Sequence, residues 1–219
     1  MNASSTQTSP RKTYSGLSDA QRAERAAERR ERFIVAGSEL FGSIGLRHTT
    51  VKGLCKAAGL TERYFYESFS AIEELFCAVY ERHTTKIREH FISQIPLMPR
   101  DLPARARMAL DSYFTMMRDE RLVRVLHIEV MGASERITAM HEADVLLAGQ
   151  VSAFLLRSDN PELLLSEDMA MSIGRLLNGG ITSLAVQWMM GGYTIPQETV
   201  VDSCVLVVLG TLHELKNRS

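Results

Sequence analysis

The sequence predicts an all-α protein, and its composition is the first reason. Leu, Ala, Arg, Glu and Met dominate, while β-branched residues are sparse before the last twenty positions. Only six prolines interrupt the 219 residues, so long stretches contain no helix breaker. A hydrophobic fraction of 45% and a charged fraction of 23% are ordinary for a globular protein, and the chain is long enough to bury a core.

The first helix is expected from about Ala20 to Gly45. Phe33, Leu40 and Phe41 recur at helical spacing and indicate one buried face, and Gly45 supplies a C-terminal stop. Before this helix the chain is polar and rich in Ser and Thr, without apolar periodicity. We expect a disordered arm there.

Two short helices follow. Thr49 or Thr50 can cap the first, and Gly59 can end it. Thr61 can cap the second. The inward positions are expected to be Val51, Leu54, Cys55 and Ala58 in the first helix, and Phe65 and Phe69 in the second.

Longer helical patterns occupy the rest of the chain. Ser70 to Glu73 has the spacing of a capping box and predicts a long helix over 71–95. The apolar run from Cys204 to Leu209 has a strand-like composition, but its length and the lack of a partner strand favour a helix. The later helices are expected over 104–118, 121–131, 134–157, 167–190 and 197–215.

The two short helices, joined at Ala58-Gly-Leu60, form a helix-turn-helix pattern. The second helix of such a unit enters the major groove and presents hydrogen-bond donors and flat groups to base edges and phosphates. Arg63, Tyr64 and Tyr66 lie off the face that carries the phenylalanines, which predicts DNA contacts. For the two tyrosines, packing over the core is the alternative.

Charge is distributed unevenly along the chain. Residues 1–70 carry eleven Lys and Arg against seven Asp and Glu, a net of +4, whereas residues 71–219 carry fourteen against nineteen, a net of −5. A basic first third suggests a polyanionic partner for that part alone.

Residues 32–80, "RFIVAGSELFGSIGLRHTTVKGLCKAAGLTERYFYESFSAIEELFCAVY", resemble the TetR family of transcriptional regulators. A helix ending in "LF", a glycine, the Thr-Thr pair, "AAGL" and the pair Tyr66 and Phe69 match in order and spacing. The resemblance implies an N-terminal three-helix DNA-binding domain followed by a helical domain that binds a ligand and forms a dimer. The implied segments are an arm over 1–27, a DNA-binding domain over 28–88 with its helix-turn-helix at 50–69, and a ligand-binding and dimerisation domain over 89–219.

Carried over by position, the resemblance implies DNA contacts from Thr50, Lys52, Thr61, Arg63, Tyr64 and Tyr66. The chain departs from the family at three positions. Arg63 stands where glycine is usual, Ser68 where histidine is usual, and Ile72 where lysine is usual. The last two departures remove expected phosphate contacts, which Arg63 or arginines of the N-terminal arm would have to replace.

The function that follows from the resemblance is ligand-responsive transcriptional control in the cytoplasm. We expect a homodimeric repressor that leaves an inverted-repeat operator in double-stranded DNA when a small, largely apolar effector binds. The dimer interface is expected on two apolar stripes, one of Ile173, Leu177, Ile181, Leu184 and Trp188, the other of Val201, Val205, Val208 and Leu212. The effector is expected to contact Phe114, Met117, His127, Val130, Met131, Leu147, Val151, Phe154 and Asn178.

Two other classes of protein remain as alternatives. A DNA-binding regulator without a ligand would need no cavity, although eleven methionines are typical of adaptable apolar pockets. An all-α enzyme within residues 100–219 is the second, but the sequence contains none of the common nucleophile, dinucleotide, phosphate-loop or HExxH zinc motifs. We therefore expect no catalytic residues, metal or cofactor, and we interpret Cys55, Cys77 and Cys204 as reduced thiols. No apolar run is long enough for a signal peptide or a membrane span.

Overall fold

The computed structural model describes residues 18–158 and 165–218, and every regular element in these ranges is helical. A 3-10 turn precedes α2 at Leu46–His48, another follows α4 at Ile95–Leu97, and a π-helical turn follows α6 at Arg124–Ile128. The all-α prediction is confirmed. The helices are α1 (Asp19–Ser43), α2 (Val51–Ala58), α3 (Glu62–Ser68), α4 (Ile72–Gln94), α5 (Leu102–Met116), α6 (Glu120–Val123), α7 (Glu135–Ser158), α8 (Glu167–Met190) and α9 (Gln197–Arg218).

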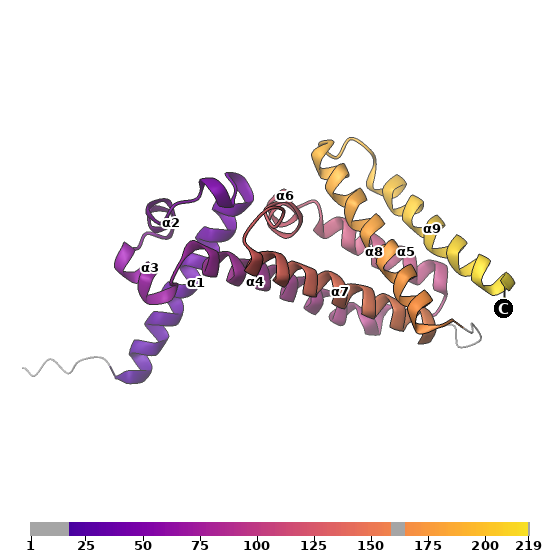
Figure 1. Cartoon of the computed structure of the whole chain (residues 1–219), viewed down its shortest axis with the longest axis horizontal. Coiled ribbons are helices and arrows are strands. Elements are labelled where there is room, and N and C mark those ends of the chain that lie inside the picture. The colour runs from indigo at the N-terminus through magenta and orange to yellow at the C-terminus, as the bar shows by residue number, and fades with distance from the viewer. Residues whose placement is uncertain (1–17, 159–164, 219) are drawn as a thin grey trace, which may run out of the picture.

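The molecule is elongated, with α1, α2 and α3 at one end (Figure 1). Helix α4 leads away from that end and runs beside α7, while α5, α8 and α9 make up the rest. In the larger part α7 packs most extensively on α8, and α5 packs on α9. This arrangement separates the helix-turn-helix from the helices expected to bind a ligand.

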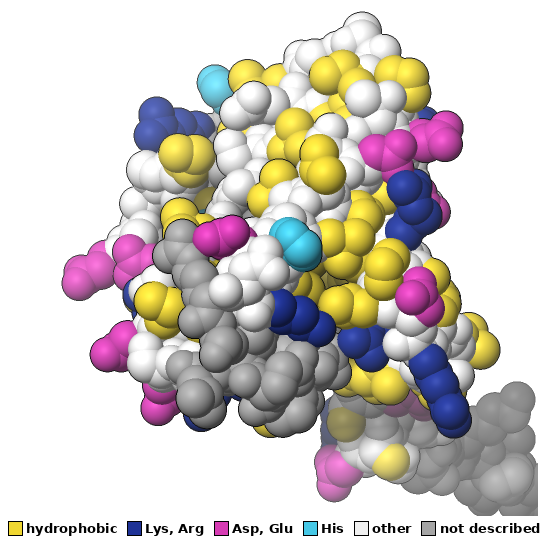
Figure 2. All heavy atoms as spheres, turned by 90° about the vertical axis from the view of Figure 1, so that its right-hand side faces the viewer, with side chains coloured by type: hydrophobic (Ala, Val, Ile, Leu, Met, Phe, Trp, Pro, Cys, Tyr) yellow, Lys and Arg dark blue, Asp and Glu magenta, His cyan; other side chains and the backbone are white. Residues whose placement is uncertain are grey.

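Apolar side chains reach the surface at the end of the molecule remote from α2 and α3 (Figure 2). In α4 and the turn after it, Ile92, Ile95 and Leu97 are exposed, and in α7 so are Phe154 and Leu155. Exposed apolar groups on this scale commonly mark a binding surface.

Helix α1 begins at Asp19, close to the expected Ala20 and inside the arm implied over 1–27. Ser18 caps it, since the Ser18 hydroxyl accepts from the Gln21 amide at 3.2 Å and the Gln21 side chain accepts from the Ser18 amide at 3.0 Å. Residues 19–27 are therefore helical, not part of an arm, because Ala, Glu and Arg follow a capping box. The part of the predicted arm at 1–17 lies outside the described residues.

The start of α4 also differs from the prediction. The capping box expected between Ser70 and Glu73 is wrong, because the helix begins after Ala71, which makes no side-chain cap. Instead the Ser70 hydroxyl and amide both donate to the Glu74 carboxylate at 2.7 Å, and these hydrogen bonds, the hydroxyl's foremost, lower the Glu74 pKa. Glu73 accepts a hydrogen bond from Ser134 at the start of α7.

Three phenylalanines hold α3 against α1. Phe65 and Phe69 are buried, as predicted, and both meet the fully buried Phe33 of α1 edge to face. The ring centroids of Phe33 lie 5.4 Å from Phe65 and 6.4 Å from Phe69. Because α3 has only seven residues, this packing and not intrinsic helix stability keeps it helical.

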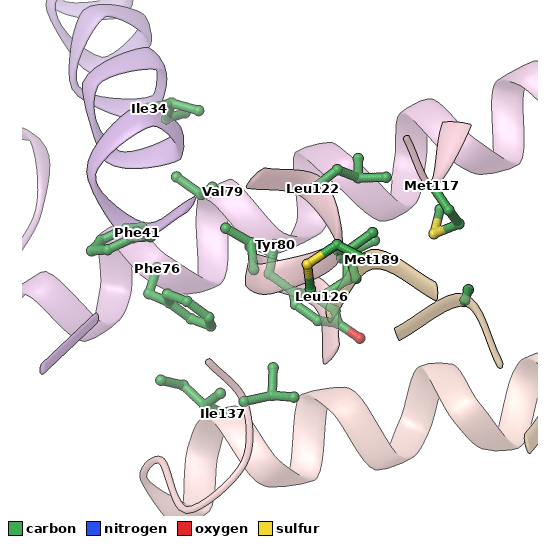
Figure 3. Packing of buried hydrophobic residues seen from close by; sticks show 14 of the residues in the cluster. Ile34, Phe41, Phe76, Val79, Tyr80, Met117, Leu122, Leu126, Ile137 and Met189 are labelled. Atoms are coloured by element: carbon green, nitrogen blue, oxygen red, sulfur yellow. The ribbon is translucent and has the colours of Figure 1, made fainter. Parts of the chain in front are cut away.

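The buried cluster continues from the helix-turn-helix into the larger part of the molecule (Figure 3). Phe41 of α1 packs edge to face on Phe76 of α4, at 5.2 Å between centroids. Tyr80 and Leu126 lie further along the same cluster, near Ile137 of α7. The two parts therefore share one core.

We predict that Phe65→Ala destabilises the protein by about 3–5 kcal/mol, because it removes a fully buried ring and leaves a cavity beside Phe33. Chemical denaturation measures the change in the free energy of unfolding. Tyr66→Ala is the matched control on the same helix: its side chain is 59% exposed, so its cost should stay within about 1 kcal/mol. Equal costs for the two variants would contradict the assignment of the helix faces.

Candidate nucleic-acid interface and effector region

The turn between α2 and α3 is built by local caps and one arginine. Thr50 caps α2 by accepting from the Gly53 amide at 3.1 Å, and Gly59 ends the helix with a left-handed φ of 62°. Arg32 of α1 then donates to the Ala58 carbonyl at 2.6 Å and to the Gly59 carbonyl at 3.2 Å. The angle at which α3 leaves the turn is thus tied to α1.

The outer face of α3 is polar and accessible. The Arg63 side chain is 84% exposed and pairs with Glu67 at 2.9 Å, one turn further along the helix. Tyr66 is 59% exposed, and Thr61 at the start of the helix is exposed as well. This face can present a cation and a flat aromatic group with a hydroxyl to a partner.

Tyr64 occupies a different place from Tyr66. It is half-buried against the core, and the guanidinium of Arg29 lies 4.5 Å from its ring centroid. Arg29 also approaches Glu67 at 3.8 Å. Of the two tyrosines, Tyr64 therefore takes the packing role that the sequence left open for both.

Five of the six predicted DNA contacts are exposed at α2 and α3, and Tyr64 is the exception. Thr50 and Lys52 are exposed at the start of α2, and Thr61, Arg63 and Tyr66 are exposed at α3. The sequence did not identify Arg29 and Arg32, which brace this surface from behind. Their spacing of three residues on α1, facing the helix-turn-helix, was the available signal.

A carboxylate links the helix-turn-helix to the larger part of the molecule. Glu129, after the π-helical turn, accepts from the Leu46 amide at 2.7 Å and lies 3.5 Å from Arg124. A Cβ at Gly45, whose φ is 87°, would come within 3.0 Å of the Glu129 carboxylate, so this approach requires glycine. Nothing in the sequence alone identifies Glu129.

Helix α1 meets α6 equally closely. A Cβ at Gly42 would lie 2.4 Å from the Arg121 Cβ, and Arg121 forms an ion pair with Glu39 of α1. Both contacts come from the segment around α6 and the π-helical turn. Movement of that segment must therefore move α1 and the turn that precedes α2.

Two histidines and a tyrosine meet where α4, the π-helical turn and α7 join. The Tyr80 hydroxyl hydrogen-bonds His141 Nδ1 at 3.1 Å, and the His141 and His127 rings are 6.4 Å apart. His127 Nδ1 is buried without a protein hydrogen-bond partner. Burial, and then the neighbouring His141, lower the pKa of His127 to about 4, while burial foremost lowers that of His141.

A cavity of about 400 Å³ opens beside this group, between α4 and α7. Its walls are mainly polar on the α4 side, and Met140 and Ala143 lie on the α7 side. The lining residues are Tyr80, Glu81, Thr84, Thr85, Arg88, Met140, Ala143 and Asp144. The site can therefore receive a molecule with both polar and apolar parts.

The structure does not bring the predicted effector residues together. Phe114, Met117 and Val130 are buried in the core, whereas Met131 is 76% exposed. Leu147, Val151 and Phe154 are exposed on α7, on the helix face that also carries Met140 and Asp144. Asn178 donates to Ser152 at 2.7 Å and to the Ala148 carbonyl at 3.1 Å, so its amide ties α8 to α7.

The predicted dimer residues divide into two groups. Five line a groove of about 450 Å³ between α8 and α9: Ile173, Leu177, Ile181, Leu184 and Val208. The other four are buried in the chain's own core, which corrects their assignment to an outer face: Trp188, Val201, Val205 and Leu212. Trp188 packs edge to face on Phe114 and donates to the Ile195 carbonyl at 2.7 Å. The side chains that face outward beside the groove are Leu176, Leu206 and Val207.

Metal-binding and membrane-spanning features are both absent from the described residues. These residues contain no group of three His, Cys, Asp or Glu side chains that could hold a metal ion. No described helix combines the length and apolarity needed to cross a membrane. Cys55, Cys77 and Cys204 are free thiols, and burial foremost raises the pKa of each.

Comparison with known proteins agrees with this geometry. The family model described as bacterial regulatory proteins, tetR family, matches residues 33–79. A sequence search of curated proteins finds no significant match.

The fold is shared with solved regulators. A putative transcriptional regulator from Pseudomonas aeruginosa PAO1 superposes with a TM-score of 0.75 at 16% identity, covering 88% of this chain and 94% of that chain. The fatty acid degradation regulator FadR from Bacillus halodurans superposes with a TM-score of 0.71 at 15% identity, and the match covers 83% of this chain and 95% of that chain. FadR from Bacillus subtilis, in complex with stearoyl-CoA, superposes with a TM-score of 0.64 at 14% identity, and the match covers 80% of this chain and 95% of that chain.

We predict that His127→Asn flattens the pH dependence of stability below pH 6.5. The pKa of His127 is about 4 in the folded protein and about 6.5 when unfolded. The stability that the folded protein has with a neutral His127 is thus fully present above pH 6.5. It is lost as the pH falls toward 4, at up to about 1.4 kcal/mol of unfolding free energy per pH unit. Denaturation at pH 7, 6 and 5 should show a smaller loss for the variant than for the wild type. Parallel curves would contradict the burial of a neutral imidazole.

Proposed function

We propose that the chain is a homodimeric repressor of the TetR family of transcriptional regulators, released from an inverted-repeat operator by an effector with a large apolar part. The family match over residues 33–79 supports a DNA-binding regulator over an enzyme. The observation that carries the proposal is the two-sided α3, with Phe65 and Phe69 buried and Arg63 and Tyr66 exposed. Because its target is DNA, we place the protein in the cytoplasm.

On DNA, α3 enters the major groove with its outer face toward the bases. Arg63 and Tyr66 supply the donors and the flat ring, while Thr50, Lys52 and Thr61 contact phosphates beside the groove. Tyr64 contributes less directly, because it supports α3 together with Arg29. Arg63 exchanges its exposed ion pair with Glu67 for a phosphate or a base, at little cost.

The outer face of α8 and α9 supports dimerisation. Leu176, Leu206 and Val207 are 75%, 74% and 58% exposed, and Leu176 and Val207 line the groove between the two helices. Around them Gly179, Gly180 and Gly210 would have no atom within 4 Å of an added Cβ. The glycines leave room for a second copy of this face to approach closely, and the large apolar side chains would be buried between the two copies.

The face of α7 beside α4 supports an apolar effector. Leu147, Val151 and Phe154 continue the line of Met140 along the helix, away from α8. A molecule with a polar end near Arg88 and an apolar chain along this face would cover them. The fold similarity to a regulator in complex with stearoyl-CoA makes fatty acyl thioesters the first effectors to test.

The path from effector to DNA passes through α4 and the π-helical turn. Tyr80 on α4 borders the effector cavity, and the same helix begins next to α3. Glu129 binds the turn before α2, so displacement of the π-helical turn shifts the helix-turn-helix. An effector acts here only by preferring a state in which the two α3 helices are wrongly spaced for the operator.

We predict that the protein selects an inverted repeat from random duplex DNA and binds it in a salt-dependent manner. If a dimer neutralises about 6–8 phosphates, the logarithm of affinity should fall with the logarithm of salt at a slope of about −5 to −7. Arg63→Ala and Tyr66→Ala should each weaken operator binding by about 1–3 kcal/mol without unfolding. Failure to enrich any sequence would refute DNA recognition.

Dimerisation can be tested on the outer face without disturbing the core. We predict that Leu176→Glu combined with Val207→Glu yields a folded monomer that no longer binds operator, as shown by sedimentation and by DNA binding. Ser203→Glu is a matched charge at an exposed position of the same groove, and with little apolar area to lose it should weaken the dimer less. A double variant that remains dimeric would place the interface elsewhere.

Effector binding should weaken operator binding, and operator binding should weaken effector binding. Calorimetric titration with stearoyl-CoA and shorter acyl-CoA thioesters should show saturable binding that weakens when operator is present. A hundredfold effect corresponds to about 2.7 kcal/mol of coupling, and reciprocity requires the same factor in both directions. Equal affinities with and without operator would exclude this mechanism.

A further inference from the structure

We propose that the first three turns of α1 form a phosphate-binding arm that runs along the DNA backbone flanking each operator half-site. The inference rests on the proposed function and adds to it a contact surface outside the helix-turn-helix. Residues 19–28 are all exposed. In Figure 1 this part of α1 extends past α3, away from the body of the molecule.

Charge is segregated around this exposed helix. Arg22, Arg25, Arg29 and Arg32 follow one another at spacings of three, four and three residues, which places them on one face. Glu24, Glu28 and Glu31 are spaced by four and three and lie on another face. The net charge of residues 19–32 is only +1, from five arginines and four acidic residues. The basic character of the arm therefore comes from this separation.

Contacts at the base of the arm fix which way the arginine face points. Arg32 donates to the carbonyls that end α2, and Arg29 stacks on Tyr64 of α3. On the other side Glu31 forms an ion pair with Arg82 of α4. Because the helix is continuous, Arg25 and Arg22 extend the face that meets the helix-turn-helix, while the glutamates point elsewhere.

The two outer arginines are available for a partner. Among the described residues Arg25 forms no ion pair, and Arg22 pairs only with Asp19, at the exposed start of the helix. An exposed pair of this kind contributes about 0–1 kcal/mol, so a phosphate can replace it. Arg22 and Arg29 are seven residues apart, about 10 Å along the axis, so the two ends of the arginine face can reach different phosphates of one strand.

The arm also supplies phosphate contacts that the helix-turn-helix lacks. Ser68 and Ile72 stand where the resemblance led us to expect a phosphate-binding histidine and lysine. Two arginines from each arm restore two positive charges per half-site, but they place them outside the recognised bases. The protein should accordingly need longer DNA than its half-sites alone.

The test compares Arg22→Ala/Arg25→Ala with the matched variant Glu24→Ala/Glu28→Ala, both in the full chain. Alanine preserves helicity, which circular dichroism verifies. Salt titrations use the operator selected by the wild type, with flanks of 2 or 8 base pairs. For the arginine variant we expect the salt slope to become shallower by about 3.6 on the long duplex, because four phosphate contacts per dimer are lost. The glutamate variant should keep the wild-type slope.

Flank length supplies a second readout. The wild type should show the shallower slope when the flanks are cut to 2 base pairs, and the arginine variant should be insensitive to this change. The proposal of a phosphate-binding arm would be overturned if the arginine variant kept the wild-type salt slope, or if the salt slope of the wild type did not depend on flank length. Failure of the wild type to select any operator would refute the proposed function instead, so the two failures are distinguishable.

Discussion

The edge-to-face packing of Phe33 on Phe65 and Phe69 is the interaction on which the DNA-binding end depends. Helix α3 contributes only seven residues, and a helix of that length does not hold its shape in water alone. Burying two of its rings against α1 fixes both its conformation and its rotation about its axis. The positions of Arg63 and Tyr66 follow directly, because burying one face of a rigid helix fixes the direction of the opposite face.

The same core explains how the two parts of the molecule communicate. Phe41, Phe76 and Tyr80 form a continuous buried path from α1 to the join of α4 and α7. Alongside it Glu129 holds the Leu46 amide, and Gly42 allows Arg121 to approach α1. Packed interiors respond to a displaced element by switching between arrangements, because they have little free volume. A displacement at the cavity between α4 and α7 can therefore reach α1 without a dedicated hinge.

Sequence reasoning succeeded where the determinants are local. The cap at Thr50, the glycine at Gly59 and the four-residue spacing of Phe65 and Phe69 act within one or two turns, so α2 and α3 were located closely. The expected range of the eighth helix, 167–190, agrees with α8 for the same reason: a capping serine precedes it and Gly191 ends it.

Apart from the helix starts at Ser18 and Ser70, the failures involve contacts between distant segments. An apolar stripe on α8 or α9 does not reveal whether its partner is the chain itself, and Trp188 and Val205 prove to belong to its own core. Likewise the face of α7 that packs on α8 is chosen by small residues, since a Cβ at Gly174 would lie 2.7 Å from the Gly149 carbonyl oxygen. That choice turns Leu147 and Phe154 outward, which no spacing rule anticipates.

The exposed first turns of α1 have a thermal consequence. The ten residues 19–28, which begin at a capping box, are shorter than an isolated helix needs to be stable, so they melt at temperatures where the phenylalanine core is intact. Association with a rigid partner would then include the enthalpy of helix formation, by an amount that grows on warming. The heat of binding should accordingly vary with temperature more steeply than buried area alone accounts for.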